Sequence, residues 1–269
     1  MDGRNEDAAG MVTAGIDIGH ERVNVVILGD GAILGHATLV ISGEVGAAAQ
    51  LAFETTLRKL GIARGSIQRI FATGVGSESV ALADGHRTQM LSHARGAHWC
   101  FPGARTVIDV GAEGSRVMRC DARGHVTDFA LNDKCAAGSG VFLETVADML
   151  DVPLAEMGAL SLRGPRDVVL TSTCAVFAES EIVAEIHRGT PREAILWGVN
   201  ESIVSRIAAA SRRVGIEREL VLTGGVARNA GIRQALREQL EMEVVVPEHP
   251  EITGALGAAL LAGEPAGAA

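Results

Sequence analysis

Residues 15–39 read GIDIGHERVNVVILGDGAILGHATL, and residues 107–131 read VIDVGAEGSRVMRCDARGHVTDFAL. Each stretch contains an apolar run that ends in an Asp-x-Gly turn, a second run typical of a β-strand, a glycine-bearing turn and a third strand. Self-similarity over a long interval indicates repeated structural units. The sequence therefore predicts two related domains, each of which begins with a three-stranded β-meander.

The size and composition of the chain suit such a pair of domains. It has 269 residues, of which 47% are hydrophobic and 21% charged, as expected of a well-packed α/β protein. The formal charge of −9, with no basic run, argues against nucleic acid as a partner. The first ten residues are polar and acidic rather than typical of a signal or transit peptide, and the longest apolar stretch is too short for a bilayer. We therefore expect no membrane association and a cytoplasmic location, where cysteines are reactive, metal-binding or buried thiols rather than disulfides.

The segments around the two repeats predict further helices and strands. A helix is expected over residues 45–60, ended by Gly61, and a strand and turn over 67–77. After the second repeat, helices are expected to begin near Ala137, Ala175 and Pro191. Thr190 is the expected N-cap of the last of these, with Pro191 at its first position and Glu193 at the capping-box position. Strands at 219–225 and 242–247, with a helix between them, complete the pattern.

The domain boundaries follow from this order of elements. We place the first domain at residues 11–103 and the second at 104–251. The final helix, within residues 252–264, is expected to pack back on the first domain.

The two Asp-x-Gly turns are candidate phosphate and metal sites. A single such turn is most often an ordinary strand end, but its duplication favours a shared function. The carboxylates of Asp17 and Asp109 suit binding of Mg²⁺ or orientation of an attacking water. Gly19 and Gly111 would let phosphate oxygens approach the backbone. We predict that Asp17 and Asp109 are catalytic and that both glycines contact nucleotide.

A third candidate site lies in residues 219–240, ELVLTGGVARNAGIRQALREQL. A strand, the triplet Thr223-Gly224-Gly225 and a helix follow one another there. Such a glycine pair lets a sugar or flat ring lie against the backbone near the N–H donors of a helix N-terminus. A tight connection without a ligand is the ordinary alternative. We predict that Thr223, Gly224 and Gly225 border adenosine.

Two of the four cysteines stand at predicted helix starts. Cys135 precedes the Gly138–Gly140 turn and a helix, and Cys174 directly precedes another helix. The positive end of a helix lowers the pKa of a thiol and stabilises an anionic sulfur centre. Two thiolates cannot hold a cubane cluster, which needs four, whereas a two-fold dimer would provide them. Cys100 and Cys120 lie among bulky residues and inside a strand, so we expect packing thiols there.

The succession of two Asp-x-Gly turns and a Gly-Gly junction resembles the actin, sugar-kinase and Hsp70 superfamily, whose domains are ribonuclease H-like. The resemblance covers nearly the whole chain, including the closing segment EITGALGAALLAG. It implies an α/β fold of duplicated domains around an ATP cleft.

The segments NDKCAAGSGVFLE (132–144), TSTCAVFAESEI (171–182) and LTGGVARNAGIRQAL (222–236) resemble the BadF/BadG/BcrA/BcrD ATPase family. This family includes the activators of 2-hydroxyacyl-CoA dehydratases and the ATPase subunits of benzoyl-CoA reductase. The resemblance implies an ATPase of anaerobic metabolism in which Cys135 and Cys174 ligate one [4Fe-4S] cluster shared across a dimer.

The same resemblance implies the cofactors and partners. Mg·ATP hydrolysis would drive a low-potential electron into a CoA-ester dehydratase or reductase. Ferredoxin or flavodoxin would donate the electron. The partner in the dimer would be a second copy of the chain or a homologous ATPase subunit.

The phosphate turns depart from the activator pattern. His20 and Glu21 stand where Ser and Thr are usual, and Ala112, Glu113 and Gly114 stand where Gly-Gln-Asp is usual. The second turn is more similar to the D-type subunit of benzoyl-CoA reductase. Three hypotheses therefore stay open: a hydrolysing activator or reductase subunit, a cluster-bearing subunit that does not hydrolyse ATP, and a small-molecule kinase with structural cysteines. Arg22 and Arg116, at matching places after the two turns, are either surface charges or phosphate ligands.

Overall fold

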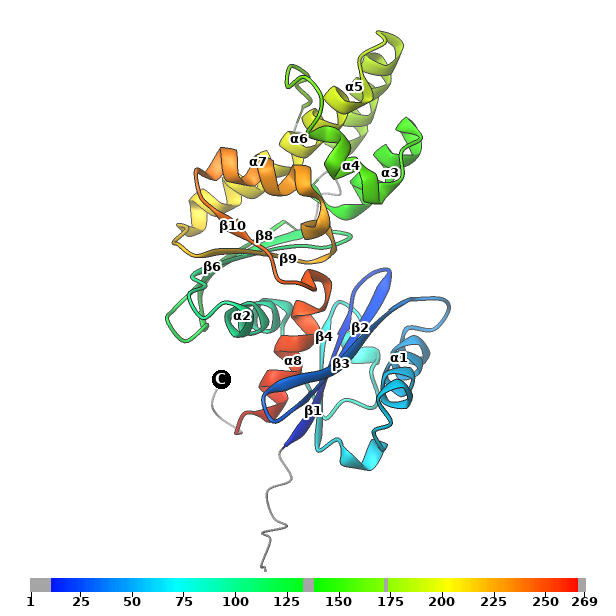
Figure 1. Ribbon diagram of the computed structural model, residues 1–269, viewed down its shortest axis with the longest axis vertical. Coiled ribbons are helices and arrows are strands. Elements are labelled where there is room, and N and C mark those ends of the chain that lie inside the picture. The colour runs from blue at the N-terminus through cyan, green and yellow to red at the C-terminus, as the bar shows by residue number, and fades with distance from the viewer. Residues whose placement is uncertain (1–10, 133–137, 172–173, 266–269) are drawn as a thin grey trace, which may run out of the picture. The chain divides into compact units, whose positions relative to one another are not determined.

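The computed structural model describes residues 11–132, 138–171 and 174–265. The chain forms two compact units (Figure 1). Of the described residues, the first unit contains those up to Gly96 together with those from Gly254 onward, and the second contains those from Ala97 to Thr253.

The first unit is built on a five-stranded sheet with the order β3-β2-β1-β4-β5. The first three strands form an antiparallel meander, and β4 and β5 are added in parallel. The strands are β1 (Val12–Ile18), β2 (Arg22–Gly29), β3 (Ala32–Val40), β4 (Arg69–Gly74) and β5 (Gly85–His86); the helices are α1 (Val45–Leu60), α2 (Gln89–Cys100) and α8 (Thr253–Gly263), and the last residues of α2 belong to the second unit.

The second unit repeats this sheet with the order β10-β9-β6-β7-β8. Its meander is again antiparallel, and β9 and β10 are again added in parallel beside the first strand of the meander. The duplication predicted from the sequence is therefore confirmed. The strands are β6 (Thr106–Val110), β7 (Ser115–Cys120), β8 (Val126–Asn132), β9 (Leu220–Thr223) and β10 (Val244–Val245); the helices are α3 (Gly140–Leu150), α4 (Leu154–Ser161), α5 (Ala175–His187), α6 (Arg192–Val214) and α7 (Ala230–Leu240).

The predicted helix ends are confirmed in one case and wrong in another. Helix α1 ends at Gly61, whose φ of 66° is the left-handed conformation that glycine adopts without strain. The expected N-cap Thr190 is wrong, because α6 begins at Arg192 with Pro191 in the N-cap position. The Thr190 hydroxyl instead donates to Glu185 Oε2 at 2.6 Å. Thr190 therefore binds to the last turn of α5 rather than to the first turn of α6.

The two sides of strand β1 pack against different helices. Successive side chains of a strand point to opposite sides of a sheet. Ala14, Ile16 and Ile18 join the cluster that α1 covers, while the Thr13 hydroxyl donates to Ala259 O of α8 at 2.8 Å. A Cβ atom on Gly15 would run into the α8 backbone at Ala255. Helix α8 thus packs directly on the face of β1 that carries Asp17.

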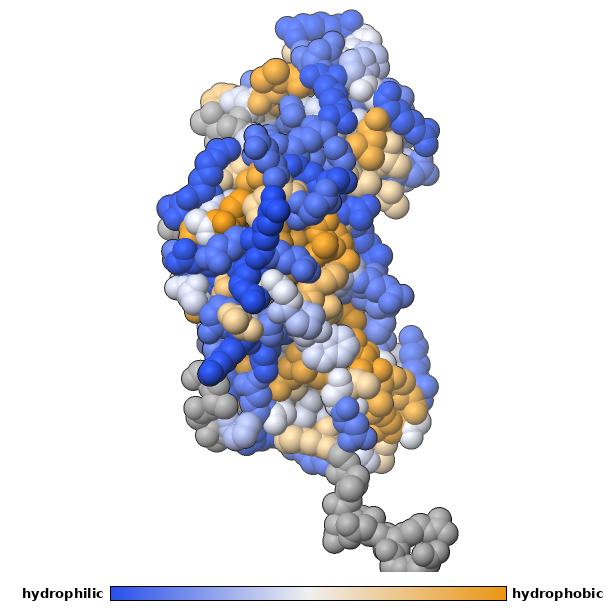
Figure 2. Space-filling model, turned by 60° about the vertical axis from the view of Figure 1, so that its left-hand side comes forward, coloured by the Kyte–Doolittle hydropathy of each residue, from blue (hydrophilic) through white to orange (hydrophobic). Residues whose placement is uncertain are grey.

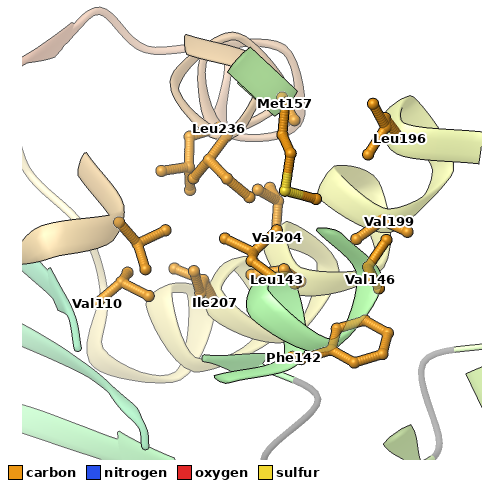
Figure 3. Packing of buried hydrophobic residues seen from close by; sticks show 14 of the residues in the cluster. Val110, Phe142, Leu143, Val146, Met157, Leu196, Val199, Val204, Ile207 and Leu236 are labelled. Atoms are coloured by element: carbon orange, nitrogen blue, oxygen red, sulfur yellow. The ribbon is translucent and has the colours of Figure 1, made fainter. Parts of the chain in front are cut away.

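The second unit has the larger core, formed where α3, α6 and α7 pack over the sheet. Phe142, Leu143 and Val146 of α3 lie beside Val199 and other residues of α6 (Figure 3). Each of these side chains is at most 3% exposed, and burial of such a side chain contributes about 1.5–3 kcal/mol. The start of α3 is therefore firmly anchored in the core.

The face of the molecule in Figure 2 is mostly hydrophilic. Figure 2 shows one face, on which hydrophilic residues predominate and hydrophobic ones form smaller patches between them. Among the residues that the structure describes, no helix combines the length and the apolar character needed to cross a bilayer.

Candidate nucleotide site

The first Asp-x-Gly turn closes β1 onto β2. Gly19 N donates to Arg22 O at 2.9 Å, which makes the reversal tight. Asp17 is only 6% exposed. On the neighbouring parallel strand β4, Asp17 pairs with Thr73, and Gly74 follows. A Cβ atom on Gly74 would lie 2.6 Å from Asp17 Oδ1, so only glycine leaves room for this carboxylate.

The second Asp-x-Gly turn repeats this geometry at the end of β6. Gly111 N donates to Gly114 O at 2.9 Å, and Asp109 is 2% exposed. Thr223 of β9 pairs with Asp109, and its hydroxyl donates to Asp109 Oδ1 at 3.4 Å. A Cβ atom on Gly224 would lie 2.6 Å from the same oxygen. In both units, therefore, the carboxylate of the Asp-x-Gly turn lies against a Thr-Gly pair at the end of the neighbouring parallel strand.

Sequence reasoning did not identify Thr73-Gly74, the Thr-Gly pair of the first unit, as part of the site. The sequence pattern predicts only a strand and turn over residues 67–77, whereas it singles out Thr223-Gly224. The glycines of the two pairs have φ values of 93° and 85°, a region that disfavours any side chain. The signal was present in the sequence: ATG at 72–74 and LTG at 222–224 stand at the ends of equivalent strands.

The Thr223-Gly224-Gly225 junction leads from β9 through a short turn into α7. Gly224 N donates to Pro250 O at 2.9 Å, and no atom lies within 4 Å of the position that a Cβ on Gly225 would take. Asn229 caps α7, because its side-chain oxygen accepts from Gly231 N and Ile232 N. A fixed backbone with open space beside Gly225 suits a bound ring or sugar.

The arginines after the two turns are not equivalent. Arg22 is exposed, whereas Arg116 is largely buried and its Nη1 lies 2.9 Å from Asp109 Oδ2. The predicted match between the two arginines is therefore wrong, because Arg116 pairs with Asp109 across β6 and β7, whereas the residue that pairs with Asp17 is Asn24. Glu113 is exposed, so its carboxylate stands at the surface of the second turn.

The two acidic residues fit a Mg²⁺·nucleotide by their chemistry. Magnesium in nucleotide sites is commonly held by one or two carboxylates together with substrate phosphates and water. Asp17 and Asp109 each supply such oxygens at the strand end of their own unit. Within the described residues, no cluster of three or more His, Cys, Asp or Glu side chains is placed to hold a metal ion.

The cysteines lie in different environments. Cys174 is the N-cap residue of α5, as predicted, and is partly exposed, whereas Cys135 lies outside the described residues. Burial raises the pKa of the Cys120 thiol to about 12 and that of Cys100 to about 11. These two thiols therefore stay protonated at neutral pH, in agreement with the packing role expected of them.

A backbone link joins the second Asp-x-Gly turn to helix α3. Gly140 N donates to Gly111 O, and Val141 N donates to Ala112 O, both at 2.9 Å. Gly140 is the first residue of α3 and follows Cys135 by five positions. A Cβ on Gly140 would lie 3.2 Å from Ala112 Cα, so the helix start and the turn are in close contact.

The duplicated sheets, the paired Asp-x-Gly turns and the Gly-Gly junction define a nucleotide-binding protein of the actin and sugar-kinase fold class. The chain resembles a ROK family glucokinase from Streptomyces griseus in complex with glucose and AMPPNP, with 13% identity, a TM-score of 0.60 and coverage of 93% and 99% of the two chains. At this identity the likeness shows the fold alone. The α/β fold class predicted from the sequence is confirmed.

The chain belongs to the BadF/BadG/BcrA/BcrD ATPase family, whose profile matches residues 14–262, and the predicted family is thereby confirmed. The activator of the 2-hydroxyisocaproyl-CoA dehydratase from Clostridium difficile, solved with bound ADPNP, is 37% identical with a TM-score of 0.89, and the match covers 94% of each chain. The D-type subunit of benzoyl-CoA reductase from Thauera aromatica is 36% identical over 93% of this chain and 92% of its own.

Proposed function

We propose that this chain is an ATP-dependent iron–sulfur protein that delivers a low-potential electron to a CoA-ester dehydratase or reductase. Ferredoxin or flavodoxin would supply the electron, and the working form would be a dimer of this chain or of this chain with a homologous subunit. The proposal rests on family membership and on relatives that are named as dehydratase activators and as a reductase subunit.

The observation that carries the proposal is the place of Cys174. It stands at the N-terminus of a 13-residue helix and is partly exposed, so the thiol is accessible to a cluster, and the positive end of the helix suits the negative charge of such a centre. The two other described cysteines are held protonated by burial. Together with Cys135, Cys174 would supply two of the four thiolates that a [4Fe-4S] cluster needs, and a second subunit would supply the others.

The surface beside Cys174 favours such a dimer. Helix α5 continues from the cysteine with Val176 65% and Phe177 62% exposed, and Val169 is 88% exposed. Val183 and Ile186 are also exposed, and at 3.6 residues per turn they lie on the side of α5 that carries Val176. Large apolar side chains that are exposed together typically mark an interaction site. Burial of this side of α5 against a second subunit would bring two copies of Cys174 toward one interface.

In the nucleotide site, Asp17 and Asp109 would bind Mg²⁺·ATP and orient the attacking water. Gly19 and Gly111 would admit phosphate oxygens to the backbone, and Thr223, Gly224 and Gly225 would border adenosine. Mg²⁺ would supply charge neutralisation at the phosphates. The close fit of both carboxylates against Gly74 and Gly224 supports this assignment, because it fixes their orientation without a nucleotide.

The link between the Gly111–Ala112 turn and the start of α3 supports coupling of the two centres. If the turn shifts when phosphate leaves, Gly140 and Val141 shift with it, since both bond to its carbonyl oxygens. The segment that carries Cys135 leads directly into this helix. The surroundings and exposure of a cluster set its potential, so nucleotide state would alter electron transfer.

The first experiment measures iron and acid-labile sulfide in anaerobically purified protein, with the EPR spectrum of the reduced sample. We expect about four irons per dimer, lost in Cys135→Ser and Cys174→Ser and retained in the matched variant Cys120→Ser. Iron-free wild-type protein after anaerobic reconstitution would contradict the proposal and favour the small-molecule kinase.

A second candidate is a cluster-bearing subunit that does not hydrolyse ATP, favoured by Glu113 and Gly114 in the second turn. It predicts the same iron content but no phosphate release by the chain alone. Phosphate release measured with and without a homologous ATPase subunit separates the two candidates. Release by the isolated protein, abolished in Asp17→Asn, supports the hydrolysing activator.

A further inference from the structure

The carboxylate of Asp17 is enclosed on the α8 side of its sheet. A Cβ atom on Gly254, in the first turn of α8, would collide with Asp17 Oδ2 and would lie 2.9 Å from His93 Nε2. The absence of a side chain at residue 254 therefore lets an imidazole and a carboxylate approach each other against the helix backbone.

His93 comes to this place from α2 and is 4% exposed. Its Nε2 lies 3.9 Å from Asp17 Oδ2, within the range of an ion pair and longer than a direct hydrogen bond. Contacts between catalytic groups are often long without substrate and tighten when it binds, and a single water can bridge this distance. Solvent screens an interaction between two side chains of such low exposure only weakly.

The second unit provides a different partner for its own aspartate. Asp109 has an arginine partner from its own hairpin, with Arg116 Nη1 at 2.9 Å from Oδ2. In the first unit, the residue paired with Asp17 on the neighbouring strand is Asn24 rather than an arginine. The repeat therefore supplies no arginine opposite Asp17, and the first unit instead brings His93 of α2 to this carboxylate.

We propose that His93 is a positioning residue for Asp17. The imidazole Nε2 holds Oδ2 and thereby fixes the carboxylate for a metal-bound nucleotide. This inference rests on the proposed nucleotide function and adds to it a residue that the sequence pattern does not reveal. Groups that orient a metal-binding carboxylate typically contribute 10- to 100-fold in metal affinity or activity.

The test compares His93→Gln with His93→Asn, two amides that place a similar polar group in the same buried space. The glutamine amide nitrogen reaches approximately the place of Nε2, whereas the asparagine nitrogen takes the place of Nδ1 and falls short. The readout is the retention of Mn²⁺ in the presence of ADP, followed by the EPR signal of free Mn²⁺, with the Mg²⁺ dependence of phosphate release beside it.

We expect His93→Gln to stay within about threefold of the wild type and His93→Asn to lose about tenfold or more in Mn²⁺ affinity. Gly254→Ala, whose added methyl group would separate the pair, should resemble His93→Asn. His125→Gln, in the exposed β7–β8 turn, is the control that should change nothing.

Equal Mn²⁺ affinity in the Gln and Asn variants overturns the inference, and so does wild-type affinity in Gly254→Ala. A wild-type protein that does not retain Mn²⁺ with ADP contradicts the proposed nucleotide function itself, which distinguishes the two failures.

Discussion

Replacement of Arg116 by Met should destabilise the second unit by about 3 kcal/mol. Arg116 Nη1 lies 2.9 Å from Asp109 Oδ2, and the two side chains are 14% and 3% exposed. Removal of one member of a buried ion pair costs about 3–5 kcal/mol, because the other charge stays buried without compensation. We take the lower end, since Thr223 Oγ1 still lies 3.4 Å from Asp109 Oδ1 and Arg116 retains some exposure.

The assay is urea unfolding followed by circular dichroism, together with a thermal scan. A loss of about 3 kcal/mol corresponds to a fall in Tm of roughly 6 °C or more for a unit of this size. Arg119→Met is the matched control, because Arg119 lies on the same strand and makes an exposed 3.4 Å contact with Thr127, worth at most about 1 kcal/mol.

Two results would refute this reasoning. One is a loss below about 1 kcal/mol in Arg116→Met, which would mean that the buried carboxylate does not depend on its arginine. The other is an equal loss in both variants, which would assign the effect to the strand rather than to the ion pair.

Three further outcomes are expected. Gly224→Ala should lower stability and nucleotide binding much more than Gly31→Ala, as measured by urea unfolding and ADP titration. Both glycines have positive φ, but only the added Cβ at Gly224 would lie 2.6 Å from Asp109 Oδ1. Similar losses in the two variants would contradict the steric argument. The neutral, buried Cys120 thiol should contribute to the free energy of unfolding below about pH 9, and this contribution should be lost as pH rises through its raised pKa of about 12. The loss of stability between these pH values should therefore be smaller in Cys120→Ala. An unchanged pH profile would show that this thiol is not the group concerned. Phe177→Ser should shift the proposed dimer toward monomer by light scattering while retaining the folded spectrum, because this side chain is 62% exposed on α5; an unchanged oligomeric state would contradict the proposed interface.

Local patterns in the sequence determined much of this protein. The repeat at 15–39 and 107–131 specified two meanders, because alternating apolar residues and glycine-bearing turns define strands and reversals at short range. Helix α1 and its end at Gly61 followed from the same kind of signal. The segments around Cys135 and Cys174 identified the family, which the comparison with known proteins confirmed.

Only the tertiary structure decided which partner each carboxylate receives. His93 reaches Asp17 because α2 and α8 pack on one face of the first sheet, and the ends of parallel strands bring Thr73 and Thr223 beside Asp17 and Asp109. The Thr190 cap failed for a different, local reason, because its hydroxyl donates to Glu185, five residues earlier in the chain. A local pattern sets strand and turn, but contacts between residues far apart in sequence depend on how the elements pack.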